Sequence, residues 1–252
     1  MRCLHIEKRF GDGMGRLLLI RHGQASFLDP NYDKLSATGE AQALRLGQYW
    51  VRQKMLFDRV CSGPRVRQRD TARIVAEVYG DAGLPFPEPV VIQQFDEYQG
   101  DAVLEQGLPL LLESNNEVRE LHRAFQDSIS PAQRLSNFEK MFQMVITKWV
   151  EGDFVLPMVE SWAEFCARGD QGLSQCMSAN GRGQQLAIFC SGGLLGVAMR
   201  RAFHLSSQDT LRAAWMVRNC SHSEFLFSND RFTLSTFNAF PHLDDISLLT
   251  YR

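Results

Sequence analysis

Residues 16–23 read RLLLIRHG, a run of aliphatic side chains that ends abruptly in a polar tripeptide. A short apolar run with glycine before it and charged residues after it is typical of a strand that is buried on both faces of a sheet. Residues 185–190 (QLAIFC) have the same character and are followed by the turn sequence SGG. Buried strands of this kind belong to parallel sheets, whose crossover connections are usually helices.

Amphipathic helices alternate with the strands in the first part of the chain. Ser36 is suited to N-cap a helix that continues to about residue 54, and residues 65–79 form a second helical stripe. Short strand-like runs lie at residues 57–61 and 90–92. This alternation predicts an α/β fold, a three-layer α/β/α sandwich with a mostly parallel sheet.

The middle of the chain changes to almost pure helical periodicity. From about residue 101 to 179 there is no convincing strand, so we expect a helical insertion or cap beside the α/β core. The aromatic and methionine side chains of residues 138–165 recur at helical spacing, which favours packing in the core over lining a substrate pocket. The expected helices lie near residues 102–113, 116–127, 132–150 and 160–178.

The last part of the chain returns to an α/β pattern. A helix is expected from the SGG turn to about residue 205. Residues 1–15 are Gly-rich and aperiodic and are expected to form a loose arm, so that residues 16–252 make a single α/β domain that carries the helical insertion. The strand-like runs near the C-terminus are residues 214–219, 223–228 and 232–237.

The composition excludes several classes of protein. The chain has 252 residues, of which 44% are hydrophobic and 22% are charged, as expected of a folded soluble protein. The 27 Lys and Arg residues are balanced by 29 Asp and Glu residues, so the basic excess typical of nucleic-acid binding is missing. No apolar run reaches the ~20 residues that cross a bilayer, so no membrane partner is expected either.

The cysteines and the N-terminus indicate a reducing compartment. The six cysteines form no CxxC pair and lie in segments with core character, so we expect buried, reduced thiols. The N-terminus lacks the apolar region of a secretory signal, which predicts a cytoplasmic location. No metal-ligand spacing and no cofactor-binding Gly-rich loop after a strand is present, so neither a metal nor another cofactor is expected.

Three polar segments follow predicted strands, where parallel sheets bind their ligands. Arg21 and His22 follow the first strand, Arg67 lies at the start of the helix after the second, and Ser191 begins the helix after QLAIFC. If these strands are neighbours, two guanidiniums, an imidazole and a helix N-terminus converge on one pocket. Because guanidinium groups match phosphate oxygens in pairs, a phosphorylated ligand is the natural candidate.

Several segments together resemble a known family. In chain order they read LLLIRHGQAS, LSATGEAQALRLG, SGPRVRQRDTA, FDEYQG and IFCSGG. They resemble the histidine phosphatase superfamily, also called phosphoglycerate mutase-like, in which a strand ends in RHG and a later element reads SPLxRAxxTA. The similarity extends over most of residues 16–240. It implies a metal-independent phosphatase, which hydrolyses a phosphomonoester or a phosphohistidine, or a phosphotransferase. The substrate would be a phosphorylated small molecule or a phosphoprotein.

The resemblance also implies a role for each matching residue. His22 would be the nucleophile that takes the phosphoryl group as a phosphohistidine. Arg21 and Arg67 would hold the phosphoryl oxygens, and Glu97 would protonate the leaving alcohol, a contribution typically of ~10²–10⁴-fold in rate. Hydrolysis is favoured over mutase action, because no part of the sequence is recognised as retaining the phosphoryl group for its return to a product.

One position departs from the family pattern. Ser191 stands before Gly192 where the family usually has a second histidine. Because the loss of one transition-state donor commonly lowers a rate ~10²–10³-fold, we expect a weakened or substrate-restricted phosphatase with Ser191 and Gly192 at the phosphate. Ser191 would alternatively serve only as a helix N-cap. Gln24 and Asn219 are further site candidates, and His222 would replace the missing imidazole unless strand alternation turns it to solvent.

Three other functions remain open from the sequence. One is a non-catalytic protein of the same fold that binds or senses a phosphorylated ligand, and another is a phosphotransferase of the phosphoglycerate mutase type. The third is a serine hydrolase in which Ser191 occupies a strand-turn-helix elbow and His242 follows it in the chain. Phe189 stands where such an elbow has its first glycine, and the cluster around His22 would then have no role.

Overall fold

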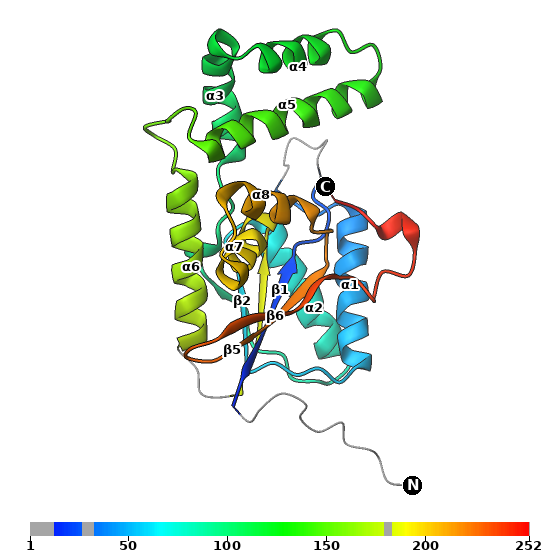
Figure 1. Ribbon diagram of the computed structural model, residues 1–252. Helices are drawn as coiled ribbons and strands as arrows, with labels where there is room; N and C mark the ends of the chain where they lie inside the picture. Colours follow the sequence, from blue (N-terminus) through cyan, green and yellow to red (C-terminus); the bar gives the residue numbers. More distant parts are fainter. Residues whose placement is uncertain (1–12, 27–32, 179–182, 252) are drawn as a thin grey trace.

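The computed structural model describes residues 13–26, 33–178 and 183–251. Its centre is a sheet of six strands in the order β3-β2-β4-β1-β5-β6 (Figure 1). The first four strands in that order are parallel, and β5 is antiparallel to both of its neighbours. This confirms the prediction of a mostly parallel sheet. The strands are β1 (Gly15–Arg21), β2 (Arg59–Ser62), β3 (Val90–Val91), β4 (Gln185–Cys190), β5 (His222–Phe227) and β6 (Phe232–Ala239).

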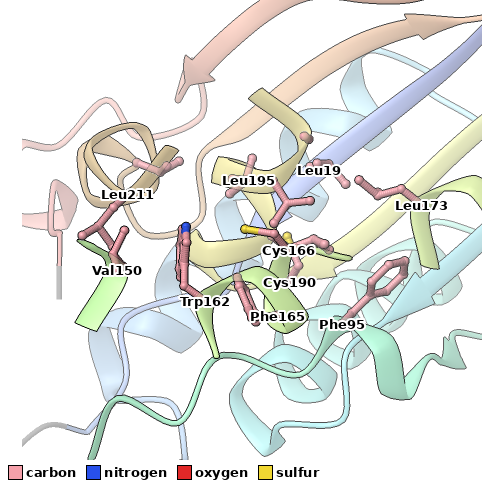
Figure 2. Packing of buried hydrophobic residues seen from close by; sticks show 14 of the residues in the cluster. Leu19, Phe95, Val150, Trp162, Phe165, Cys166, Leu173, Cys190, Leu195 and Leu211 are labelled. Carbon is pink, nitrogen blue, oxygen red and sulfur yellow. The ribbon is translucent and has the colours of Figure 1, made fainter. Parts of the chain in front are cut away.

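Helices cover both faces of this sheet, as a strand with two buried faces requires. Leu18 and Ile20 pack against α1 (Ala37–Arg52) and α2 (Val66–Asp81). Leu17 and Leu19 point to the other face, which α6 (Trp162–Ser178), α7 (Gly192–Phe203) and α8 (Ser207–Met216) cover. The three layers of the predicted α/β/α sandwich are therefore present (Figure 1). Figure 2 shows part of the hydrophobic cluster between the sheet and α6–α8, in which Phe165 and Leu173 of α6 lie near Cys190 and Leu195.

The helix that follows β1 starts where the sequence predicts. The Ser36 hydroxyl accepts a hydrogen bond from the Gly39 N–H at 3.1 Å and so caps α1. Trp50 and Leu46 are buried on its inner face, whereas Leu44, which the helical stripe includes, is 43% exposed.

The helical insertion divides into two parts. The helices α3 (Gly100–Ser114), α4 (Asn116–Gln126) and α5 (Pro131–Glu151) lie beyond one end of the sheet (Figure 1). The fourth helix, α6, instead runs along the sheet and contacts α7, because Phe165, Cys166 and Leu173 form one side of the core. Only α3–α5 therefore form a cap, and α6 is a core helix.

One predicted strand is instead the end of a helix and the turn that follows it. Residues 214–219 read as strand-like, but α8 continues to Met216. The Ser206 hydroxyl caps this helix by accepting from the Asp209 N–H at 3.1 Å, and Thr210, Leu211 and Ala214 are buried together on one of its faces. The helical spacing of these buried residues therefore outweighs the β-propensity of the short run at its end.

The described cysteines are buried free thiols, as predicted. Cys61 of β2 and Cys176 of α6 have sulfur atoms 3.9 Å apart, and Cys3 lies outside the described residues. The expected N-terminal arm also falls almost entirely outside them. In the part of the chain that the structure describes, no helix has the length and apolar character needed to span a membrane.

Candidate active site

A cavity of about 1110 Å³ lies where the parallel strands end at their carboxyl side, between the core and the cap. It is lined by Arg21 and His22 after β1, by Arg67 of α2, by Glu97 and by Gly192 of α7. The sequence placed these five residues in one pocket from three strand ends and a family resemblance. The structure brings all five together.

His22 is held as a neutral imidazole. Its Nδ1 lies 2.7 Å from the carbonyl oxygen of Gly23, which only accepts, so Nδ1 carries the proton. Its Nε2 accepts a hydrogen bond from Arg67 Nε at 3.0 Å. The side chain is 5% exposed, and burial together with the charges of Arg67 and Arg21 holds the pKa of His22 well below its ordinary value. The ring therefore presents an unprotonated nitrogen at the wall of the cavity.

Backbone contacts fix His22 between three strands. Its N–H donates to the Cys190 carbonyl at 2.8 Å, and its own carbonyl accepts from the Cys220 N–H at 3.1 Å. The Asn219 amide also donates to this carbonyl, at 3.3 Å. Asn219 therefore supports His22 from behind and does not line the cavity.

The two arginines reach the cavity from different elements. Arg21 ends β1, and its guanidinium donates to the carbonyl of Val217. Arg67 is 7% exposed and forms an ion pair with Asp33, whose Oδ1 lies 2.6 Å from the guanidinium. The other oxygen of Asp33 accepts from the Val66 N–H at 2.9 Å, so this carboxylate lies at the N-terminus of α2.

Asp33 is a residue of the site that the sequence reading missed. It lines the cavity and binds Arg67 where an anionic ligand would compete for the same guanidinium. A single aspartate between a loop and a helix belongs to no pattern, so no sequence signal was available to find it.

Glu97 lines the cavity at the N-terminus of α7. Its two oxygens accept hydrogen bonds from the backbone N–H groups of Gly193 and Tyr98, each at 3.1 Å. Burial raises the pKa of Glu97 even though these two hydrogen bonds and the arginines favour its charged form. A Cβ at Gly193 would lie 2.1 Å from Glu97 Oε1, so only glycine allows the carboxyl to sit over the helix N-terminus.

Ser191 precedes α7 but does not cap it. Its hydroxyl makes no cap hydrogen bond; instead it accepts from the Gln68 side-chain amide at 2.8 Å and is 2% exposed. Gln68 is itself fully buried, and its oxygen accepts from the Arg65 N–H at 3.0 Å. Ser191 is thus joined to α2 under the cavity wall and is not one of the lining residues.

Gln24 and His222 lie outside the cavity. The Gln24 side chain accepts from the Ser36 hydroxyl at 2.9 Å, next to the start of α1. His222 pairs with Ile20 across β5 and β1, and cross-strand partners point to the same face of a sheet. The His222 ring accordingly packs near Trp50 and His242, with ring centroids 6.5 and 6.3 Å away. It supplies no imidazole to the site.

The cap contributes aromatic side chains to the cavity. Phe138 and Phe142 of α5 line it, together with Tyr98 and with Trp215 of α8. The sequence favoured core packing for the aromatic residues of this region. That holds for Trp149, Trp162 and Phe165, which are buried, but Phe138 and Phe142 are only partly buried, because they occupy the next turns on the face of α5 that looks toward the core.

Metal ligands are not grouped at this site. Across residues 13–26, 33–178 and 183–251, no cluster of three or more His, Cys, Asp or Glu side chains has an arrangement that would hold a metal ion.

Comparison with known proteins identifies the class to which this fold and site belong. A family model of the histidine phosphatase superfamily (branch 1) matches residues 17–97 and 102–239. The chain therefore belongs to the histidine phosphatase superfamily. A search of the curated proteins gave no match.

Solved structures share the fold at low sequence identity. A phosphoglycerate mutase from Bacillus anthracis is 14% identical, with 92% of this chain and 96% of that chain covered and a TM-score of 0.60. A phosphoserine phosphatase from Entamoeba histolytica, solved with 3-phosphoglyceric acid, is 18% identical, with coverage of 91% and 99% and a TM-score of 0.58. A mycobacterial glucosyl-3-phosphoglycerate phosphatase is 17% identical, with coverage of 90% and 99% and a TM-score of 0.58.

Proposed function

We propose that the chain is a metal-independent phosphatase that hydrolyses phosphomonoesters through a phosphohistidine on His22. The observation that carries this proposal is the state of the His22 ring. Its Nδ1–H is bound to the Gly23 carbonyl and its Nε2 faces the cavity beside Arg67. A neutral, oriented ring nitrogen next to a guanidinium is the arrangement that nucleophilic attack on a phosphate requires.

In the first step, His22 Nε2 forms a bond to phosphorus while the bond from phosphorus to the alcohol oxygen breaks. Arg67 Nε–H points at Nε2, so its guanidinium must first turn toward the phosphoryl oxygens. At an effective dielectric constant of ~20, each arginine at ~4 Å supplies about 4 kcal/mol of gross attraction to the anion. Glu97 donates its proton to the departing alcohol, since its raised pKa favours the protonated form.

In the second step, a water molecule attacks the phosphorus of the phosphohistidine. Glu97, now a carboxylate, removes the proton from this water, and the bond from phosphorus to Nε2 breaks. Inorganic phosphate leaves, His22 is neutral again and Glu97 is protonated again, so protons and electron pairs balance. The Gly193 N–H holds Glu97 in place through both steps.

Ser191 limits this chemistry in the proposed enzyme. Its hydroxyl is bound to Gln68 and replaces the second imidazole that the family pattern has. The site thus has one fewer cationic donor for the phosphoryl oxygens, a loss that commonly lowers a rate ~10²–10³-fold. We therefore expect slow turnover of generic esters, with better rates for substrates that gain binding energy elsewhere in the cavity.

The proposal is tested with p-nitrophenyl phosphate and His22→Ala. The wild-type chain should release phosphate, and His22→Ala should lose more than about a thousandfold in rate, as loss of a nucleophile does. Acid-labile, base-stable label from ³²P substrate should appear on wild type only. His122→Ala, on α4 of the cap, is the matched control. Equal rates for wild type and His22→Ala would refute the proposal.

Non-catalytic binding of a phosphorylated ligand is the second candidate. The pairing of Asp33 with Arg67 and the sequestered Ser191 favour it, because both weaken the site as a catalyst. Inorganic phosphate that binds to wild type but not to Arg67→Ala, without turnover of any ester, would support this candidate. Transfer of the phosphoryl group to an added alcohol, and not to water, would support a mutase-type phosphotransferase.

A serine hydrolase has less support. The Ser191 hydroxyl is buried against Gln68, whereas His242 packs near Tyr49 and His222. Labelling of wild type by a fluorophosphonate, lost in Ser191→Ala, would reverse this conclusion.

A further inference from the structure

The cavity has two ends with different chemistry. The arginines that line it, Arg21, Arg65 and Arg67, lie with His22 at the strand ends. At the other end the lining is aromatic, with Phe138 and Phe142 from the cap and Tyr98 and Trp215 from the core. A phosphomonoester bound through its phosphate would therefore extend its alcohol portion toward these rings.

The aromatic side chains form a continuous wall. Phe138 and Phe142 are stacked with ring centroids 6.1 Å apart. Tyr98 and Phe142 both close on Gly100, where an added Cβ would lie 3.2 and 3.1 Å from their rings. Glycine at this position lets the two rings approach each other at the junction of core and cap. Aromatic rings attract other rings in offset or edge-to-face arrangements with centroids about 4.5–7 Å apart.

The charges at this end are negative. Asp101 and Glu139 line the cavity on the cap side, and among the described lining residues every Lys or Arg lies at the phosphate end. A substrate with a second anionic group, such as a carboxylate, would face these two carboxylates, with no Lys or Arg among the described lining residues of the cap. At short range, like charges in a partly enclosed site disfavour binding.

The size of the cavity also indicates a substrate with a large alcohol portion. Its volume of about 1110 Å³ is far larger than a three-carbon phosphate fills. Pockets of roughly 300–1,000 Å³ typically enclose ligands of drug size, lined by apolar and aromatic groups with a few polar anchors.

We propose that this pocket selects phosphomonoesters of alcohols that carry an aromatic or similarly flat apolar group and no second negative charge. This inference rests on the proposed function and deepens it, because the same cavity holds both the arginines that would bind the phosphate and the aromatic side chains that would select the alcohol. It separates the chain from phosphoglycerate-type chemistry, in which the alcohol portion itself is anionic.

The test compares alkyl esters with similar leaving groups. Ethyl phosphate, 2-phenylethyl phosphate and 3-phosphoglycerate differ mainly in the body of the alcohol. We expect kcat/KM for 2-phenylethyl phosphate to exceed that for ethyl phosphate by about tenfold or more, as filling an apolar pocket does. We expect 3-phosphoglycerate to be the poorest of the three. Equal values for the first two, or a preference for 3-phosphoglycerate, would overturn the inference.

Variants locate the selectivity. Phe142→Leu keeps an apolar side chain but removes the ring, and should reduce the preference for the phenyl ester severalfold. Phe203→Leu, at an exposed position at the end of α7, is the matched control and should retain the preference. The double variant Asp101→Asn/Glu139→Gln should raise kcat/KM for 3-phosphoglycerate relative to ethyl phosphate. If neither pocket variant changes its ratio of kcat/KM values, the selectivity does not come from the aromatic rings and carboxylates of the cavity, and the inference is refuted.

Phosphonates separate this inference from the proposed function. Ethylphosphonate and 2-phenylethylphosphonate cannot be hydrolysed, and their binding to wild type is measured by calorimetry. If the phenyl compound binds about tenfold more tightly but no ester is hydrolysed, the proposed phosphatase activity is refuted and the proposed selectivity of the pocket stands. If all esters are hydrolysed and the two phosphonates bind with equal affinity, the proposed selectivity is refuted and the proposed phosphatase activity stands.

Discussion

Burial shifts the pKa values of His22, the proposed nucleophile, and Glu97, the proposed proton donor, in opposite directions. It lowers the pKa of His22 and raises the pKa of Glu97, so both side chains favour their neutral forms. A neutral imidazole is a competent nucleophile, and a neutral carboxyl is a competent acid. The same dry site therefore prepares both groups, although one is a base and the other an acid.

A pH dependence follows from these two directions. His22 remains neutral down to well below its ordinary pKa, so it limits the rate only on the acid side. Glu97 loses its proton as the pH rises through its raised pKa, so kcat/KM for 2-phenylethyl phosphate should fall on the alkaline side. Glu97→Gln should remove this alkaline limb and slow the alkyl ester more than p-nitrophenyl phosphate, whose leaving group needs no proton.

The pH profile of Glu97→Gln decides this prediction. An alkaline limb that survives in Glu97→Gln would assign the titration to another group. Glu77→Gln, on the exposed face of α2 and paired with Arg73, is the control for nonspecific changes in charge.

Asp33 places a negative charge where the proposed substrate also places one. It contacts both the Arg67 guanidinium and the Val66 N–H at the start of α2. Asp33→Asn removes the charge and keeps one of the two oxygens that accept from these donors. We expect inorganic phosphate to inhibit Asp33→Asn at concentrations severalfold lower than wild type, measured as a competitive inhibition constant. Weaker inhibition would mean that Asp33 mainly orients Arg67.

At the level of elements, α2 and α7 are joined beneath the site by one buried hydrogen bond. Gln68 of α2 donates to the Ser191 hydroxyl and thereby fills the space next to it. The SPLxRAxxTA pattern has alanine where this chain has Gln68. The large residue at position 68 and the small residue at position 191 are therefore complementary in size.

This complementarity predicts how an imidazole is restored. Ser191→His alone should collide with Gln68 and lower the free energy of unfolding by about 1–3 kcal/mol, as overpacking does. Gln68→Ala/Ser191→His should regain stability and raise turnover of p-nitrophenyl phosphate above wild type. Urea unfolding and initial rates measure the two effects. A double variant that folds well but is slower than wild type would show that the site depends on the hydroxyl.

The N-terminus of α7 predicts a second effect at the element scale. A Cβ at Gly193 would lie 2.1 Å from Glu97 Oε1 and 2.7 Å from the Phe165 ring. Gly193→Ala should therefore displace Glu97 and lower kcat for alkyl esters more than for p-nitrophenyl phosphate. Gly80→Ala, in α2 with no atom within 4 Å of the new Cβ, is the control. It should leave activity unchanged and stabilise the protein by about 0.4–1 kcal/mol.

For the whole molecule, local sequence signals predict the elements, and long-range packing decides the rest. The aliphatic runs of β1 and β4 and the Ser36 cap are visible in the sequence because each depends on a few adjacent residues. The convergence of His22 and Arg67 follows from the rule that parallel strands bind ligands at their carboxyl ends. These features could be predicted without any tertiary contact.

Features that depend on contacts between distant segments could not be predicted. Asp33 joins the site only because its loop meets the start of α2, and Gln68 only because the first turn of α2 reaches Ser191 at the start of α7. Phe142 and Trp149 lie on the same face of α5, yet Phe142 lines the cavity, whereas Trp149 is buried against Tyr98 and Trp162. Alternation alone left the direction of His222 undecided until the pairing of β5 with β1 was known.

The buried pair of His222 and His242 predicts how the whole molecule responds to acid. Burial lowers the pKa of His222 to about 4 and of His242 to about 3, from an ordinary value of 6.5. Between pH 6.5 and pH 4 the unfolded chain therefore binds protons that the native state does not, so the free energy of unfolding falls as the pH falls through this window. At 1.36 kcal/mol per pH unit, each imidazole accounts for about 2 kcal/mol between pH 6.5 and pH 5.

Urea unfolding at pH 7.5 and pH 5 should show that His222→Gln/His242→Gln loses about 4 kcal/mol less stability than wild type over this range. His22 contributes in the same direction in both proteins, and the exposed His204→Asn should behave as wild type does. An equal loss in the double variant and in wild type would mean that the two rings take up protons in the folded state, and the packing of β5 against α1 would then have to open in acid.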